Sequence, residues 1–265
     1  MLENEKEDDR RCLLEGMVSL RALIEARAAG VNARPIERVL FDSGFLALHG
    51  REGEEKRRLL GFLRAMSREH GFMLDGVNRE ALDGLCEGTT HGGVVAVCGD
   101  RPLPSPSPAA LPEKGFFMML DGIEDPYNFG YAMRSVYAAG ADGVLLPPRN
   151  WMSAAGTVCR ASAGASERLP LYVAEGAEAV AVFHAASYKI VCADGDAEKS
   201  VWNSDAALSR PLLLVVGGER RGISKAVRDA ADESVRLEYG RPFREALSAA
   251  SSAAVLAFEV LRRSQ

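Results

Sequence analysis

The first hundred residues show two kinds of hydrophobic pattern. From Leu13 onward, apolar residues recur at mixed three- and four-residue spacing, which predicts an amphipathic helix that ends near Gly30. The run IERVLF at 36–41 is short and β-branched and predicts a strand. A charged stretch then places apolar residues on one side of a predicted helix over 53–70.

A short helix and a buried strand are predicted to close this first region. Asn78 is expected to cap a helix that runs to Cys86, and a glycine-rich turn leads into an apolar strand at 94–98. His91 lies in this turn, where we expect a hydrogen-bonded turn residue and not a catalyst. Residues 1–12 are charged and are expected to form a solvated tail.

A proline-rich stretch divides the chain. Residues 101–112 contain five prolines and few residues that pack, as in a stiff linker. The predicted organisation is therefore a domain over 1–100, a linker over 101–113 and a second domain over 114–265.

Beyond the linker, strand-like runs alternate with helix-compatible ones. Runs such as FFMML and LLLVV are apolar on both faces, which is typical of parallel strands covered by helices on each side. The predicted strands are 116–120, 144–146, 169–173, 189–192, 212–216 and 235–237. The helix-compatible segments between them are 128–140, 152–163, 175–187 and 222–231. This alternation predicts a doubly wound, Rossmann-like α/β domain.

The last predicted element, 244–263, is expected to be the longest helix. It is dense in alanine and serine, and small side chains permit close approach of a ligand or a partner helix.

Composition narrows the functional class. The chain has 265 residues, of which 47% are hydrophobic and 26% charged, a composition typical of a folded protein. It contains no apolar run long enough to span a bilayer. The N-terminus lacks a secretory signal, and five cysteines without CxxC spacing argue against a zinc site or a disulfide framework. We therefore expect a soluble protein of the reducing cytoplasm that needs no metal.

The net charge of −5 gives no global reason to expect nucleic-acid binding. Any such contact must come from local patches. The basic face of the 53–70 helix could meet phosphate, or it could be an ordinary solvated surface.

The first candidate motif is NxGxxxR, which follows a predicted buried strand. Asp125 and Pro126 suit a tight bend, and Asn128 is a candidate helix cap. Arg134 is six residues beyond Asn128, so both can reach the rim of one cleft if Asn128 lies in the turn. The alternative is a capped helix with a solvated arginine.

The second motif, LLLVVGGERRGIS at 212–224, is a buried strand that ends in glycines and Glu219. Ligands of open α/β sheets bind outside the carboxyl ends of strands, where glycines admit close approach. The motif is not GxGxxG and lacks the lysine of a phosphate-binding loop, which argues against an NAD-type enzyme. A third junction, at 237–248, joins a strand to the final helix.

Taken with RASAGASERLPLY at 160–172, these segments resemble the SpoU branch of the SPOUT RNA methyltransferases across 114–265. The first domain, through EGMVSLRALIEA and THGGVVAV, resembles the L30e-like RNA-binding domain that many SpoU enzymes carry.

The resemblance implies a C-terminal trefoil knot, S-adenosylmethionine as cofactor, and a homodimer formed by the C-terminal domain. It also implies transfer of a methyl group to a ribose 2′-hydroxyl of RNA, with rRNA favoured over tRNA. The residues it assigns to the cofactor are Ala193, Gly195, Gly217, Glu219, Ile223, Leu237, Ala246 and Leu247. Those it assigns to catalysis are Asn128, Arg134, Glu219 and Ser248.

One departure from the family pattern leaves a second hypothesis open. Where the family commonly has Ser-Leu-Asn, this chain has Ala246-Leu247-Ser248. Loss of a well-placed transition-state hydrogen bond costs roughly 10² or more in rate. The alternative is therefore an RNA-binding or ribosome-assembly protein of the same fold that has lost methyl transfer. Which RNA nucleotide is the target does not follow from the sequence.

Overall fold

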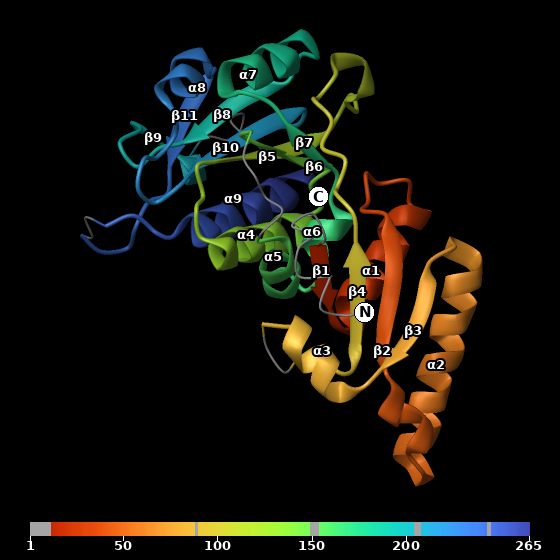
Figure 1. Ribbon diagram of the computed structural model, residues 1–265. Coiled ribbons are helices and arrows are strands. Elements are labelled where there is room, and N and C mark those ends of the chain that lie inside the picture. The colour runs from red at the N-terminus through yellow and green to blue at the C-terminus, as the bar shows by residue number, and fades with distance from the viewer. Residues whose placement is uncertain (1–11, 88–89, 149–153, 204–207, 243–244) are drawn as a thin grey trace. The chain divides into compact units, whose positions relative to one another are not determined.

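The computed structural model describes residues 12–87, 90–148, 154–203, 208–242 and 245–265 (Figure 1). It divides into two compact units. The first holds the chain up to Pro102 together with the helices between Trp151 and Arg168, and the second holds the remainder. The predicted domain boundaries stay a prediction, but the RASAGASE segment packs within the first unit.

The first unit is a four-stranded sheet, in the order β1-β4-β2-β3, covered on both faces. β2 pairs parallel with β3, and β4 runs antiparallel to both β1 and β2. Its elements are β1 (Cys12–Glu15), α1 (Gly16–Ala28), β2 (Ile36–Asp42), α2 (Gly50–His70), β3 (Met73–Val77), α3 (Arg79–Leu85), β4 (Val94–Cys98), α5 (Ala155–Ala161) and α6 (Ala165–Arg168). A 3₁₀ turn, η2 (Ser43–Ala47), precedes α2.

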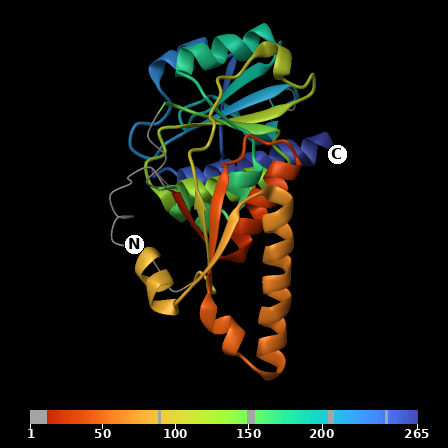
Figure 2. The same ribbon diagram turned by 45° about the vertical axis from the view of Figure 1, so that its right-hand side comes forward.

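Side chains on alternate positions of these strands enter two different cores. Val39 and Ala96 point to the face covered by α1, α2 and α5, whereas Leu40 and Val95 meet α3 on the other face. Figure 2 shows α2 running alongside this sheet.

The start of the first predicted helix was wrong, because Cys12–Glu15 is strand β1 and the helix begins only at Gly16. β1 is held by its pairing with β4, eighty or more residues away, which no local periodicity reveals. Gly16 has φ +81, a conformation that glycine adopts without strain, and it makes the turn from strand to helix. Asn78 does cap α3, since its Oδ1 accepts the Ala81 N–H at 2.8 Å.

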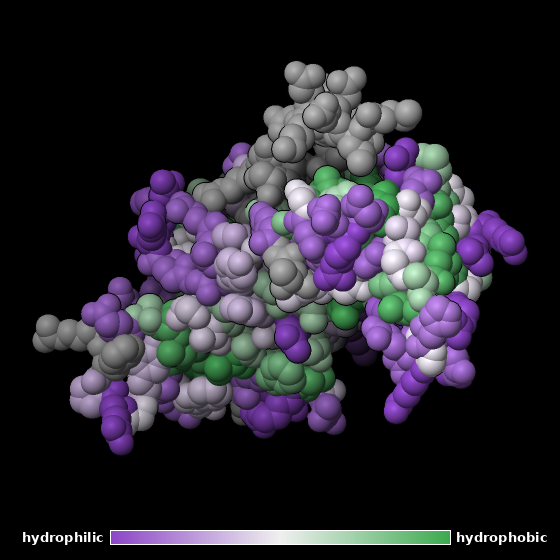
Figure 3. Space-filling model, turned by 60° about the horizontal axis from the view of Figure 1, so that its bottom comes forward, coloured by the Kyte–Doolittle hydropathy of each residue, from purple (hydrophilic) through white to green (hydrophobic). Residues whose placement is uncertain are grey.

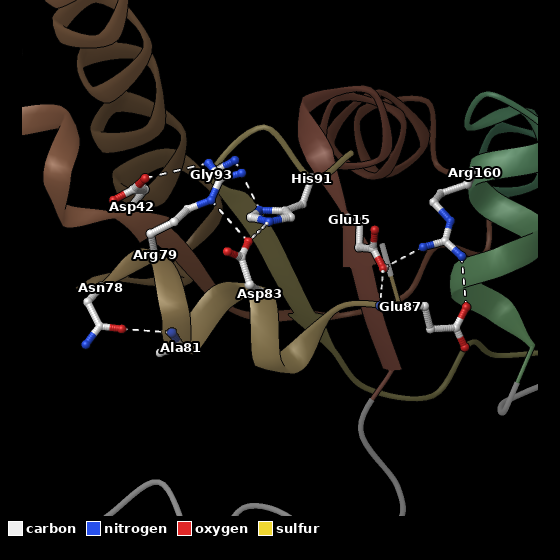
Figure 4. A network of polar contacts seen from close by, with 10 residues as sticks. All are labelled: Glu15, Asp42, Asn78, Arg79, Ala81, Asp83, Glu87, His91, Gly93 and Arg160. Carbon is white, nitrogen blue, oxygen red and sulfur yellow. Dashed lines mark hydrogen bonds and ion pairs between the residues drawn. The ribbon is translucent and has the colours of Figure 1, made fainter. Parts of the chain in front are cut away.

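The turn before β4 is held by a polar network (Figure 4). His91 is fully buried; its Nδ1 accepts the Gly93 N–H at 3.1 Å, and its Nε2 lies 2.8 Å from Asp83 Oδ1. Because a backbone amide can only donate, Nδ1 carries no proton and Nε2 donates to Asp83. This hydrogen bond is the chief cause of a lowered pKa at Asp83. His91 is therefore a structural turn residue, as the sequence predicts.

Charged side chains fix α5 and α6 to the first unit. Arg160 donates to Glu15 Oε1 at 2.6 Å and to Glu87 Oε2 at 2.8 Å (Figure 4). On α6, the buried Glu167 lies 3.4 Å from Arg34 Nε. Breaking a buried pair of this kind leaves an uncompensated charge, so these contacts specify where the two helices pack.

The second unit is a seven-stranded parallel sheet in the order β7-β6-β5-β10-β8-β11-β9. Its strands are β5 (Phe116–Asp121), β6 (Gly143–Leu146), β7 (Leu171–Val173), β8 (Lys189–Ala193), β9 (Lys199–Ser200), β10 (Leu212–Gly217) and β11 (Glu233–Arg236). Its helices are α4 (Pro126–Ala138), α7 (Gly176–Ala185), α8 (Lys225–Ala230) and α9 (Ala249–Ser264), with 3₁₀ turns η3 (Pro108–Ala110) and η4 (Val201–Asn203). This confirms the predicted α/β class with a parallel sheet; the trefoil knot stays a prediction.

Helices cover both faces of this sheet, with α7 and α8 on one side and α4 and α9 on the other (Figure 1). Phe117 and Met119 pack among residues of α7 and α8, and the alternate side chains Phe116 and Met118 are fully buried on the opposite face. Among the described helices, none is long and apolar enough to cross a membrane.

The last helix is shorter than predicted. It begins at Ala249 instead of 244 and has 16 residues, so α2, with 21, is longer. The reason is local: Ser248 Oγ accepts the Ser251 N–H at 3.2 Å and so caps the helix at this point.

The end of α9 provides a test of acid stability. Glu259 is almost buried and accepts hydrogen bonds from Arg262 and Arg263, which lower its pKa from 4.5 to about 2. A lowered folded-state pKa stabilises the fold above the unfolded value, and this contribution is lost as pH falls from about 4.5 to about 2. Glu259→Gln should lower the free energy of unfolding at pH 7 by about 1–3 kcal/mol.

Urea unfolding measured at several pH values checks this prediction. The variant should show a shallower loss of stability below pH 4.5 than the natural chain. Glu178→Gln, at an exposed position on α7, should unfold like the natural chain. Equal acid sensitivity in the Glu259 variant and the natural chain would contradict the assignment.

Candidate functional site

A cavity of about 670 Å³ opens where the carboxyl ends of β8, β10 and β11 meet. These parallel strands end on the same edge of the sheet, so the loops that follow them face one space. The segment before α9 also lines the cavity, through Glu245, Ala246 and Leu247. All eight predicted cofactor residues line this cavity: Ala193, Gly195, Gly217, Glu219, Ile223, Leu237, Ala246 and Leu247. Their roles toward a cofactor stay predictions.

Glycines give this cavity its shape. A Cβ on Gly217 would overlap the backbone of Gly222 and Ile223, and one on Gly218 would overlap the backbone of Gly122. Gly195 differs, because a Cβ there would meet open space. The residues fit S-adenosylmethionine, since they combine backbone groups at close range, apolar side chains from Ile223 and Leu247, and room for a nucleoside.

Charges of both signs surround the cavity. Asp194 lies 3.6 Å from Arg228, and Arg236 Nη1 donates to the carbonyl of Ala197 at 2.7 Å. At the end of β8, burial raises the pKa of the Cys192 thiol to about 12. The thiol therefore stays neutral at pH 7 and does not compete as a nucleophile beside the cavity.

Glu219 joins three segments that are distant in the sequence. Its Oε1 accepts from Asn128 Nδ2 at 3.0 Å and from the Ala249 N–H at 3.1 Å. One carboxylate thus connects the loop after β10 to the starts of α4 and α9. Removing it would leave the Asn128 amide and the helix terminus without this acceptor.

Asn128 is not the helix cap that the sequence suggests. Asp125 is the cap, and its Oδ1 accepts the Asn128 N–H at 2.7 Å. Pro126 has no N–H and a fixed φ, so it fits the first helical position and moves the cap one residue before itself. This frees the Asn128 side chain to bind Glu219.

Arg134 lies further along α4, at an exposed position outside the cavity lining. Its side chain is exposed, it does not line the cavity, and within the described part of the chain it has no hydrogen bond or ion pair. It shares its helix face with Tyr127 and Tyr131, each 50% exposed. A single chain therefore brings Asn128 to the cavity through Glu219 but does not bring Arg134.

Ser248 also lies outside the cavity lining. Its hydroxyl caps α9 and is 3.0 Å from Ser251 Oγ, while Ser252 reaches the cavity instead. Sequence reasoning missed Ser252 and Tyr239, whose hydroxyl accepts the Leu247 N–H at 3.2 Å. Tyr239 lies three residues beyond the end of β11, and this position near a strand end was the signal that could have found it.

Among the residues that the structure describes, no group of three His, Cys, Asp or Glu side chains is arranged to hold a metal ion.

Comparison with known proteins gives consistent matches. Residues 115–258 match the model of the SpoU rRNA Methylase family. The chain is 30% identical over 198 residues to the 23S rRNA (guanosine-2′-O-)-methyltransferase RlmB of Photorhabdus laumondii, covering 73% of this chain and 80% of the relative. It is also 30% identical over 203 residues to the putative TrmH family tRNA/rRNA methyltransferase YacO of Bacillus subtilis, covering 75% and 80%.

Solved structures share the fold along the whole chain. The AdoMet-bound rRNA methyltransferase from Sinorhizobium meliloti superposes with a TM-score of 0.77 at 20% identity, covering 98% of this chain and 90% of that one. The SpoU methyltransferase AviRb from Streptomyces viridochromogenes, in complex with AdoMet, gives 0.75 at 21% identity, covering 98% and 93%.

Proposed function

The chain belongs to the SpoU rRNA methylase family, and from this premise we propose that it transfers a methyl group from S-adenosylmethionine to a ribose 2′-hydroxyl of RNA. The observation that carries the proposal is the glycine-shaped cavity, where the eight expected cofactor residues come together. RlmB of Photorhabdus laumondii is by name a 23S rRNA methyltransferase, which supports rRNA over tRNA as the substrate class.

When bound, the cofactor supplies an electrophilic methyl group. Gly217, Leu237 and Leu247 would hold it largely through backbone groups, so binding would tolerate side-chain change nearby. Glu219 fixes the Asn128 amide at the start of α4. A ribose hydroxyl is a weak nucleophile that must be oriented and relieved of its proton.

Arg134 has a different task from a free base. A guanidinium is protonated at any ordinary pH, so it does not take the hydroxyl proton, which would pass to solvent. It holds the phosphate beside the target ribose and stabilises the negative charge that develops on the 2′-oxygen.

A homodimer completes the site in this proposal. Arg134 is exposed outside its own cavity, so a second copy is needed to bring it to a cavity. On α9, Val255 and Phe258 are exposed large apolar residues. In the view of Figure 3, green, hydrophobic side chains gather in patches on the surface. Self-association of such a face would give a two-fold dimer.

Five free thiols and an RNA substrate also favour the reducing cytoplasm as the site of action.

The direct test uses RNA from cells that lack this protein. Incubation with labelled S-adenosylmethionine should place label on RNA at a 2′-hydroxyl, recovered after alkaline hydrolysis as a resistant dinucleotide. Tight cofactor binding without transfer to any cellular RNA would defeat the enzyme proposal and favour an RNA-binding or assembly protein of the same fold.

A double variant separates a native site from a decayed one. Ala246→Ser with Ser248→Asn restores the common family residues, and asparagine caps helices as well as serine, so α9 should stay intact. We expect transfer that is unchanged or lower, because the Ser248 and Ser251 hydroxyls already form a polar pair. A gain of activity from an inactive natural chain would indicate a decayed enzyme.

A further inference from the structure

Four residues form a stripe along the outer side of α2: Arg57, Gly61, Arg64 and Arg68, here called the arginine stripe. They are spaced i, i+4, i+7 and i+11, which places them on one helix face, and all four are exposed. The side of α2 that faces the sheet buries Leu60 and Leu63 in the core of the first unit.

Arginines near the start of α2 have acidic neighbours on the helix, whereas Arg64 and Arg68 near its end have each other. Near its start, Arg51 lies 3.5 Å from Glu55 at i+4. Arg64 and Arg68 instead form a like-charge pair at i,i+4, which destabilises a helix by a few tenths of a kcal/mol. Among the described residues neither has a hydrogen bond or ion pair, whereas Arg57 Nη1 donates to the Leu48 carbonyl at 3.4 Å. The helix dipole favours Arg68 in the last turn but gives no reason for Arg64.

Gly61 is the second unexplained feature. Glycine inside a helix costs roughly 0.5–1 kcal/mol relative to alanine. A Cβ at Gly61 would meet nothing within 4 Å, and the residue is not in the left-handed region, so no packing within the chain requires glycine here. The missing side chain leaves a gap between Arg57 and Arg64, which suits close approach of something from outside.

We propose that the arginine stripe binds the phosphodiester backbone of the RNA substrate, with the backbone seated over Gly61 between Arg57 and Arg64. This inference rests on the proposed function for the identity of its ligand. Guanidinium groups match phosphate oxygens in bidentate geometry, and a phosphate strand also relieves the repulsion between Arg64 and Arg68. The stripe lacks apolar residues, which a membrane-surface helix would need.

Gly61→Leu in the full chain should raise thermal stability and lower the affinity for RNA. Leucine has a higher helix propensity than glycine, so the thermal unfolding midpoint should rise. Its side chain should also block the place over residue 61 where the RNA backbone is proposed to lie. Affinity for a fluorescently labelled RNA stem-loop should fall by about tenfold or more, with affinity for S-adenosylmethionine unchanged. Gly61→Ala should raise the midpoint as well and weaken RNA binding less.

The salt dependence identifies the phosphate contacts. Arg64→Gln with Arg68→Gln should reduce the slope of log affinity against log salt by about one to two. Arg51→Gln, off the stripe and paired with Glu55, is the matched control and should keep the natural slope. Natural affinity and slope in both the Gly61→Leu and the Arg64/Arg68 variants would overturn the inference. So would binding to phosphatidylserine vesicles that Gly61→Leu abolishes while RNA binding persists.

The two proposals can fail separately. Methyl transfer by the natural chain with an unaffected Gly61→Leu variant would refute the arginine stripe alone. Stripe-dependent RNA binding without methyl transfer would refute the enzyme and keep the stripe.

Discussion

Replacing Arg134 with alanine should abolish methyl transfer to RNA while leaving the affinity for S-adenosylmethionine unchanged. The side chain is exposed on α4 and does not line the cavity, so its loss removes nothing that touches the cofactor within one chain. If it stabilises charge on the 2′-oxygen, the rate constant for transfer should fall by roughly 10² or more. Single-turnover transfer and equilibrium cofactor binding measure the two effects separately.

Two controls accompany this variant. The free energy of unfolding should not change, since Arg134 is solvated and has no described partner. Arg134→Lys keeps the charge but loses the planar donor pair, so it should recover little activity. Transfer at the natural rate in the alanine variant would exclude Arg134 from catalysis.

The same variant tests the proposed dimer. Mixing Arg134→Ala chains with chains that cannot bind cofactor should restore part of the transfer, because some mixed dimers pair an intact cavity with an intact arginine. No recovery after exchange of chains, or a monomeric mass in light scattering, would count against a site shared between two copies.

The second large effect is a loss of cofactor affinity, expected on substitution of Gly217 in the cavity lining. Gly217→Ala should weaken S-adenosylmethionine binding by roughly 10- to 100-fold, because overpacking against fixed backbone costs about 1–3 kcal/mol and each 1.4 kcal/mol is tenfold. The added Cβ overlaps the backbone of Gly222 and Ile223, which cannot move without changing the loop that carries Glu219. Isothermal titration with S-adenosylmethionine measures the loss.

A glycine outside the cavity lining, Gly240, controls for this substitution. Gly240→Ala adds a Cβ that meets nothing within 4 Å and should bind cofactor normally. If Gly217→Ala fails to fold, Gly195→Leu serves instead, because its side chain starts in open space at the cavity wall. Natural affinity in a folded Gly217→Ala or Gly195→Leu variant would remove the cavity from the cofactor proposal.

The central strands could be predicted from sequence because their environment is encoded locally. FFMML and LLLVV are buried on both faces as β5 and β10, and such runs have few other stable placements. Two edge strands escaped prediction. β3 (Met73–Val77) has no fully buried residue and β9 has two residues, so neither has a strong pattern.

Candidate residues of the cavity were found by resemblance and by the rule that ligands bind at strand ends. This rule identifies the loops that follow the strands, but it does not identify which side chains in those loops contact one another. It gave no reason to expect that Glu219 would hold Asn128 and the first amide of α9 together, since these three residues are separated by 91 and 30 positions. Long-range hydrogen bonds of this kind depend on how whole elements pack.

The sequence by itself determined the alternation of buried strands with helices. It also determined the helix cap at Asn78, the turn at Asp125 and Pro126, and the glycines that end β10. These follow from hydrophobic period and backbone preference, which act over a few residues. Only the tertiary structure decided that Cys12–Glu15 is a strand, that α5 and α6 pack with the first unit, and that Arg134 lies outside the lining of its own cavity. Each of these depends on partners far away in the chain, whose free energy appears only when the elements are packed together.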